Sequence, residues 1–144
     1  MTSASSGRSR PPMDDVRVVR PHERDVGTAQ TPGMRREAGV AGSTVGADEL
    51  WMGYVSMAPG MKSGAHHHGP IESAIYVISG RVRIRFGPRL EQSVDAGPGD
   101  FIFVPAEAVH QEINLDDAAP VEMIVARGGQ ENVVVNVELP EGGA

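Results

Sequence analysis

Short runs of Val and Ile, each ended by Gly or Pro, recur along most of this chain and restrict the folds that it can adopt. Val and Ile together number 25, whereas there are only four Leu, and β-branched side chains favour strands over helices. The 18 Gly and 11 Pro residues divide the chain at intervals of about 8–12 residues, which is typical of turns between short strands. The pattern predicts an all-β domain of short strands and tight turns.

The clearest strand is residues 81–86, where Val82, Ile84 and Phe86 alternate with three arginines. Strict alternation predicts a strand with one buried face. Further strands are expected at residues 16–20, 50–58, 73–79, 92–96, 101–104, 110–115, 121–127 and 133–139. Such a series of short strands predicts a sandwich, jelly roll or small barrel.

Composition narrows both the domain organisation and the class of partner. Residues 1–15, rich in Ser, Arg and Pro, are expected to form a flexible N-terminal tail before a single domain at residues 16–144. The net charge of −6 argues against nucleic acid as a partner.

No apolar run approaches the ~20 residues needed to cross a membrane, and no secretory signal is recognisable, so we expect a cytoplasmic protein. The absence of Cys excludes disulfides, thiolate zinc sites and cysteine nucleophiles.

Three consecutive histidines, His66, His67 and His68, are the most informative polar cluster. In an extended strand, side chains two residues apart share a face. His66 and His68 can therefore bind one metal ion, while His67 should point away. Imidazole is a ligand for Zn, Fe, Ni, Co and Cu.

Further fixed spacings surround these histidines. The first stretch reads Gly60-x5-His66-x-His68-x3-Glu72-x7-Gly80, and the second reads Gly99-x5-Pro105-x4-His110-x3-Asn114. They resemble the two sequence motifs of the cupin superfamily, and the resemblance covers about residues 50–139. It implies a cupin jelly-roll β-sandwich or barrel with His66, His68 and His110 as metal ligands. Glu107 stands where the second motif usually has Gly.

The carboxylate ligand of the first motif is ambiguous in this chain. Glu72 fits the spacing from His68, whereas Ser73 fits the spacing to Gly80. A shift of one residue turns a side chain to the opposite face of a strand. The two positions therefore predict different sites.

Two alternatives follow. If Ser73 faces the interior, the site is histidine-rich, and His67 becomes a candidate fourth ligand. If a β-bulge near residues 69–70 turns Glu72 inward, Glu72 can bind the metal or act as a base. We favour the histidine-rich alternative and expect catalytic roles for Glu72 and Tyr76.

Other side chains are assigned from their positions in the expected strands. Tyr54, Gln111 and Asn114 are candidates to line the cavity, although Asn114 is more easily explained as holding a turn. Glu112 shares a strand face with His110, but a lone acidic side chain is more often solvated. The methionines, Trp51, Phe101 and Phe103 are expected mostly in the core; the methionines are Met52, Met57, Met61 and Met123.

The resemblance also implies a function. Small cupins of actinobacterial type include polyketide cyclases of the resistomycin type, so a metal-dependent cyclase is expected, with an aldol-type cyclisation of a poly-β-keto intermediate in antibiotic biosynthesis. The cofactor would be a divalent metal, with Zn favoured over Fe, Ni or Co. The substrate would be a small molecule in an apolar barrel cavity. A cupin dioxygenase and a non-enzymatic binding protein are the alternatives, and a homodimer is expected.

Overall fold

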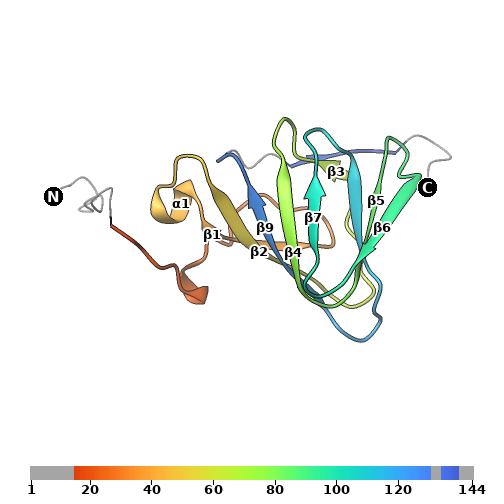
Figure 1. The fold of residues 1–144 in the computed structure, drawn as a ribbon, viewed down its shortest axis with the longest axis horizontal. Coiled ribbons are helices and arrows are strands. Elements are labelled where there is room, and N and C mark those ends of the chain that lie inside the picture. Colours follow the sequence, from red (N-terminus) through yellow and green to blue (C-terminus); the bar gives the residue numbers. More distant parts are fainter. Residues whose placement is uncertain (1–14, 131–133, 140–144) are drawn as a thin grey trace.

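The computed structural model describes residues 15–130 and 134–139, and the regular secondary structure of this part of the chain is almost wholly strand (Figure 1). The tail expected at residues 1–15 lies, apart from Asp15, outside the described residues. The elements in chain order are η2 (Pro21–Glu23), β1 (Arg35–Val40), α1 (Gly42–Val45), β2 (Trp51–Met57), β3 (His66–His67), β4 (Ser73–Ser79), β5 (Val82–Phe86), β6 (Gln92–Ala96), β7 (Phe101–Val104), β8 (His110–Asn114), β9 (Val121–Arg127) and β10 (Val135–Asn136).

The strands form two five-stranded antiparallel sheets, as expected for a jelly roll. One sheet has the order β1-β2-β9-β4-β7, and the other has the order β10-β3-β8-β5-β6. In Figure 1 the strands β2, β9, β4 and β7 follow one another across the first sheet. Neighbours along the chain therefore often lie in different sheets, and sequence-distant strands such as β2 and β9 pair over their full length.

The core lies between the sheets because buried residues alternate along each strand. On β9 every second residue from Val121 to Arg127 is buried, and on β4 the buried residues are Ser73, Ile75 and Val77. These side chains pack with Trp51 and other apolar residues in one cluster. The all-β jelly-roll prediction is confirmed.

The strand predictions hold best in the centre of the chain. The bounds of β4, β6, β7 and β9 match the predicted ranges. Residues 16–20 form no strand, and Val16 is 96 % exposed, because nothing in the described chain pairs with this segment. β1 was not predicted, since its sequence, RREAGV, carries too few apolar residues to show an alternating pattern.

Phe101 and Phe103 do not lie in the core. They are 79 % and 62 % exposed, whereas Val104 is buried. β7 pairs only with β4 and ends its sheet, which leaves both phenylalanines exposed at the edge, where Phe103 also borders a cavity. Met52 and Met61 are also exposed, while Trp51, Met57 and Met123 are buried as expected.

The turn between β4 and β5 depends on Gly80. Its φ of +87° lies in the left-handed region, and a Cβ atom there would approach the backbone oxygen of Pro120 to 2.8 Å. Glycine alone relieves both constraints. Among the described residues no helix is long and apolar enough to cross a membrane.

Candidate metal centre

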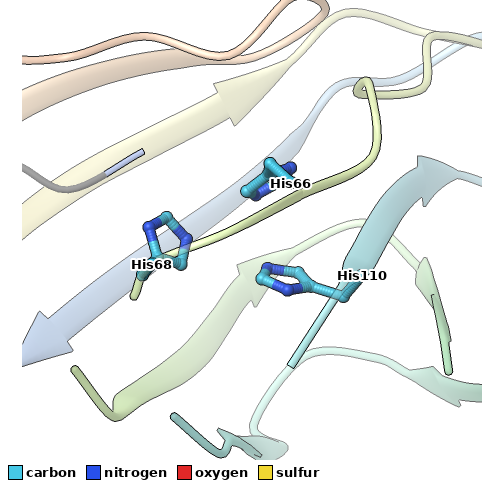
Figure 2. Close-up of side chains that lie close together, drawn as sticks. All are labelled: His66, His68 and His110. Carbon is cyan, nitrogen blue, oxygen red and sulfur yellow. The ribbon is translucent and has the colours of Figure 1, made fainter. Parts of the chain in front are cut away.

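Three histidines from two strands meet in the interior of the barrel (Figure 2). His66 lies in β3 and is paired in register with His110, the first residue of β8. His68 follows β3 and shares the face of His66, as the spacing of two predicts. All three are buried, and one ligand atom from each lies within 4.8 Å of the others.

Backbone carbonyls orient two of these rings. Nδ1 of His66 lies 2.9 Å from the oxygen of Gly64, and Nδ1 of His110 lies 2.8 Å from the oxygen of Ala108. A carbonyl oxygen only accepts hydrogen bonds, so each Nδ1 carries the proton and donates it. The Nε2 atoms, which face Glu112, are thereby left as the atoms that would bind an ion, the arrangement typical of metal-binding histidines.

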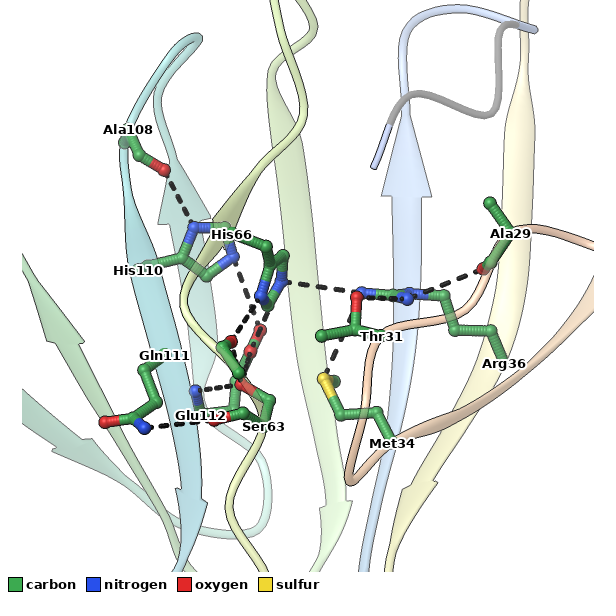
Figure 3. A network of polar contacts seen from close by, with 11 residues as sticks. Ala29, Thr31, Met34, Arg36, Ser63, His66, Ala108, His110, Gln111 and Glu112 are labelled. Carbon is green, nitrogen blue, oxygen red and sulfur yellow. Dashed lines mark hydrogen bonds and ion pairs between the residues drawn. The ribbon is translucent and has the colours of Figure 1, made fainter. Parts of the chain in front are cut away.

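Glu112 supplies a carboxylate to the same centre (Figure 3). Its two oxygens lie 3.5 Å from Nε2 of His66 and 3.5 Å from Nε2 of His110. Ser63 fixes its position by donating to Oε1 at 3.2 Å and accepting from the backbone N–H of Glu112 at 2.9 Å. Glu112 is therefore buried and held toward the histidines, contrary to the solvated position that is commoner for a lone acid.

The charges at the centre shift the pKa values of these groups. Burial lowers the pKa of His66 to about 4, outweighing the attraction of Glu112. Burial also disfavours the charged form of His110, but attraction to Glu112 and a hydrogen bond with it raise its pKa. Burial alone would raise the pKa of Glu112, yet the attraction of His110 and His66 holds it well below its usual range. Glu112 is thus ionised at neutral pH.

The donor set fits a divalent metal ion. Three imidazoles, two of them oriented by backbone carbonyls, and an ionised carboxylate converge without any thiol, a combination that suits first-row transition metals and Zn. His66, His68 and His110 would hold the ion, with Glu112 beside them.

The structure places the other predicted site residues elsewhere. Glu72 is exposed, and Tyr76 lies on the outer face of β4, 38 % exposed and against the ring of Phe101. His67 points away from the cluster as its parity predicts, and its Nδ1 accepts a hydrogen bond from the N–H of Gly69. None of the three joins the centre, and their predicted roles remain untested.

The register at β4 settles the ambiguity of the first motif. Ser73 is buried and lines the same small cavity as His68 and His110. Ser73 therefore faces the interior, the register of the alternative in which the usual carboxylate position is lost, and the ligand set itself stays a prediction. The carboxylate at the centre comes instead from Glu112 on β8, which lies in the second motif.

The loops of the two motifs are tied together. The backbone N–H of Glu107 donates to the oxygen of Gly69 at 2.7 Å. Glu107 has a φ of +64°, a left-handed conformation that explains why glycine is usual at this position of the motif. Asn114 holds a turn as expected, since its side-chain amide donates to the oxygen of Ala119 at 2.9 Å.

Two buried arginines were missed by the sequence reasoning. Nη1 of Arg36, on β1, donates to Thr31 at 2.8 Å, and Nη2 lies 3.5 Å from Nε2 of His66. Arg127, the last residue of β9, stacks on Trp51 at 4.0 Å. The alternation of Val121, Met123 and Val125 on β9 could have identified Arg127 as inward-facing. No such signal marked Arg36, because β1 itself was not predicted.

A second, larger cavity adjoins the centre. It has a volume of about 550 Å³ and lies between β5, β6, β7 and the loop before β8. Its walls are mostly apolar and include Ile84, Phe86, Val94, Phe103, Val109 and, at the centre, His110. Whether this cavity binds the expected small-molecule substrate stays a prediction. Tyr54, a predicted cavity residue, instead lies on the outer face of β2 and donates to Glu122.

Comparison with known proteins agrees with this fold. The cupin domain family matches residues 53–127, a segment that contains the three histidines and Glu112. The chain therefore belongs to the cupins.

One relative by sequence is the polyketide synthase CurC of Streptomyces cyaneus. It is 28 % identical over 114 residues, which are 76 % of this chain and 65 % of CurC. This chain thus spans about two thirds of the length of that relative.

Solved structures share the fold at lower identity. The polyketide cyclase RemF of Streptomyces resistomycificus has a TM-score of 0.66 and 21 % identity, over 90 % of this chain and 89 % of RemF. Oxalate oxidase in complex with glycolate has a TM-score of 0.70 and 19 % identity, over 94 % of this chain and 73 % of that chain. An oxalate decarboxylase of Bacillus subtilis with Mn(II) centres has a TM-score of 0.66 and 19 % identity, over 80 % of this chain and 32 % of the decarboxylase chain.

Proposed function

We propose that this cupin is a metal-dependent enzyme that cyclises a poly-β-keto substrate by an aldol-type reaction. The observation that carries the proposal is the position of His110, which belongs to the three-histidine cluster and also lines the apolar cavity of about 550 Å³. A carbonyl chain bound in that cavity would have its reacting end at the histidines. The likeness to the polyketide cyclase RemF and to the polyketide synthase CurC supports this substrate class.

The residues of the chain have separate tasks in this proposal. His66, His68 and His110 would hold the ion, and the carbonyls of Gly64 and Ala108 fix two of the rings. A bound divalent ion, for which we propose Zn, would act as a Lewis acid toward carbonyl oxygens and stabilise an enolate. Glu112 would offset part of the positive charge.

The walls of the apolar cavity complete the proposed site. Ile84, Phe86 and Val109 exclude water from the substrate, and this strengthens every electrostatic interaction inside. A confined chain brings its nucleophilic carbon and its carbonyl together, which replaces an encounter by a positioned reaction.

The first test is the metal content of tag-free protein purified without added metal, measured by mass spectrometry. We expect about one Zn per chain, followed by ring formation when a poly-β-ketoacyl substrate is added. Fe, Ni or Cu in its place, together with oxygen consumption, would support the dioxygenase alternative. No metal after reconstitution would contradict an enzymatic role. The homodimer remains a prediction, which light scattering in solution would test.

A further inference from the structure

A small polar cavity lies on the inner side of the histidine cluster. Its volume is about 10 Å³, which is room for one water-sized group. Ser73, Arg127 and Glu112 line it together with His68 and His110. His110 and Val104 also line the large apolar cavity, so the two spaces share these two wall residues beside the histidine cluster.

Two neighbouring side chains present unused hydrogen-bonding groups to this space. Ser73 and Arg127 are direct cross-strand partners on β4 and β9, and both are buried. Oγ of Ser73 and the Nε and Nη1 atoms of Arg127 have no hydrogen-bond partner among the described residues. Buried polar groups of this kind are rarely left unpaired.

The charges around the small cavity also favour the binding of an anion there. Of the described residues, Arg36 and Arg127 bring two guanidinium groups to the wall of the cavity, and Glu112 brings the single carboxylate. Arg36 already bonds to Thr31 and approaches His66, whereas Arg127 stacks on Trp51 without an ionic partner among the described residues. With neutral histidines one positive charge is left over, and an uncompensated buried charge is unfavourable. A metal ion on the histidines would increase this excess.

We propose that Arg127 and Ser73 form an oxyanion subsite that binds the carboxylate or enolate oxygen of a ligand whose apolar body fills the cavity of about 550 Å³. This deepens the proposed function, on which it rests, by defining the substrate as an amphipathic molecule with an anionic oxygen head. The unpaired Nε–H and Nη1–H of Arg127 lie on different edges of its guanidinium, so each can donate to a single anionic oxygen. Ser73 adds a hydroxyl donor at the position where the family motif would place a carboxylate, which would repel an anion.

Binding of 2-naphthoate and of 2-naphthamide to the metal-loaded protein tests the proposal by calorimetry. The two probes share an apolar body, and only the first has an anionic head. We expect 2-naphthoate to bind the wild type and Arg127→Gln to weaken this binding about tenfold or more, because charge-assisted hydrogen bonds are lost. The weak binding of 2-naphthamide should be unchanged in the same variant.

The matched control is Arg83→Gln. Arg83 lies on the outer side of β5 and pairs with Asp95 at 2.7 Å, so 2-naphthoate affinity should stay at the wild-type value. Arg127→Lys keeps the charge but not the fixed directions of the guanidinium N–H donors and should give intermediate affinity. Equal binding of 2-naphthoate to the wild type and Arg127→Gln would overturn the subsite, as would no binding to the wild type at millimolar concentration.

A second measurement needs no variant and covers the case in which Arg127 substitutions fail to fold. In ¹⁵N NMR of the wild type, the Nε–H signal of Arg127 should shift on addition of 2-naphthoate and not of 2-naphthamide. A stationary Nε–H signal while the Val104 methyl signals move would overturn the proposal.

Failure of the subsite and failure of the cyclase can be told apart. Anion binding that depends on Arg127, without turnover of any poly-β-keto substrate, would support the subsite and refute the cyclase. Cyclisation together with anion binding that does not depend on Arg127 would support the cyclase and refute the subsite.

Discussion

Strands β4 and β8 both pass the histidine centre with a glutamate close by, and they differ in which face carries it. On β4 the buried face is Ser73, Ile75 and Val77, and the preceding Glu72 is exposed. On β8 the buried face is His110, Glu112 and Asn114. β4 thus gives the barrel mostly apolar packing, whereas β8 gives it polar groups. The comparison shows that strand parity decides which glutamate of this chain reaches the centre.

The strongest test of the polar face of β8 is His110→Ala. Loss of a ligand should lower metal affinity by more than about a hundredfold, since changes in outer partners alone cost about 10–100-fold. Metal content and competition with a chromophoric chelator measure this. The control is His67→Ala, which should keep wild-type affinity because His67 lies outside the cluster. Metal retention in His110→Ala, or its loss in His67→Ala, would contradict the assigned centre.

The apolar face of β4 is tested by replacing Ile with Ala at two positions, one on each face of the strand. Ile75 is 3 % exposed and Ile78 is 43 % exposed. Ile75→Ala should lower the free energy of unfolding by about 2–5 kcal/mol through lost burial and a cavity. Ile78→Ala should change it by less than about 0.5 kcal/mol. Urea denaturation of both variants gives the comparison, and similar losses would show that the register of β4 is wrong.

The two glutamates can be compared directly. Glu112→Gln should weaken metal binding by about 10–100-fold, because it removes the charge that faces His66 and His110. Glu72→Gln removes the same charge from an exposed position and should leave metal affinity unchanged. A larger loss of metal affinity in Glu72→Gln than in Glu112→Gln, measured in the same chelator competition, would contradict this prediction. It would assign the carboxylate of the centre to Glu72, as in the usual first motif.

The smallest expected effect concerns the outer face of the first sheet. Burial, and then the hydrogen bond to Glu122, raise the pKa of Tyr54 to about 12. An unfolded tyrosine has a pKa near 10. Tyr54 therefore stabilises the fold fully below about pH 10, and this contribution is lost as pH rises from about 10 to about 12.

Absorbance at 295 nm and unfolding at several pH values measure this effect. Glu122→Gln should lower the pKa of Tyr54, because the hydrogen bond and the negative charge both favour the neutral phenol. Tyr54→Phe should remove the corresponding part of the pH dependence of stability. An unchanged profile in Tyr54→Phe would show that this contact does not stabilise the fold.

Local sequence patterns alone determined most of the strands and identified the histidines that meet in the interior. Alternation in residues 73–79 and 121–127 defines β4 and β9, because a strand with one buried face repeats every two residues. The spacing of His66 and His68 places both on one face for the same reason. The turn at Gly80 is likewise local, since it depends on backbone conformation.

Only the tertiary structure decided which polar groups meet in the interior. Arg36 comes from β1, which has no clear pattern of its own, and reaches His66 from the opposite sheet. Arg127 and Ser73 are 54 positions apart in the chain, and sheet pairing alone makes them neighbours. The sequence places Glu112 on the same face of β8 as His110. Its burial, however, depends on Ser63 and on the two histidines that compensate its charge. Contacts between distant strands follow from sheet topology and packing, which local periodicity does not encode.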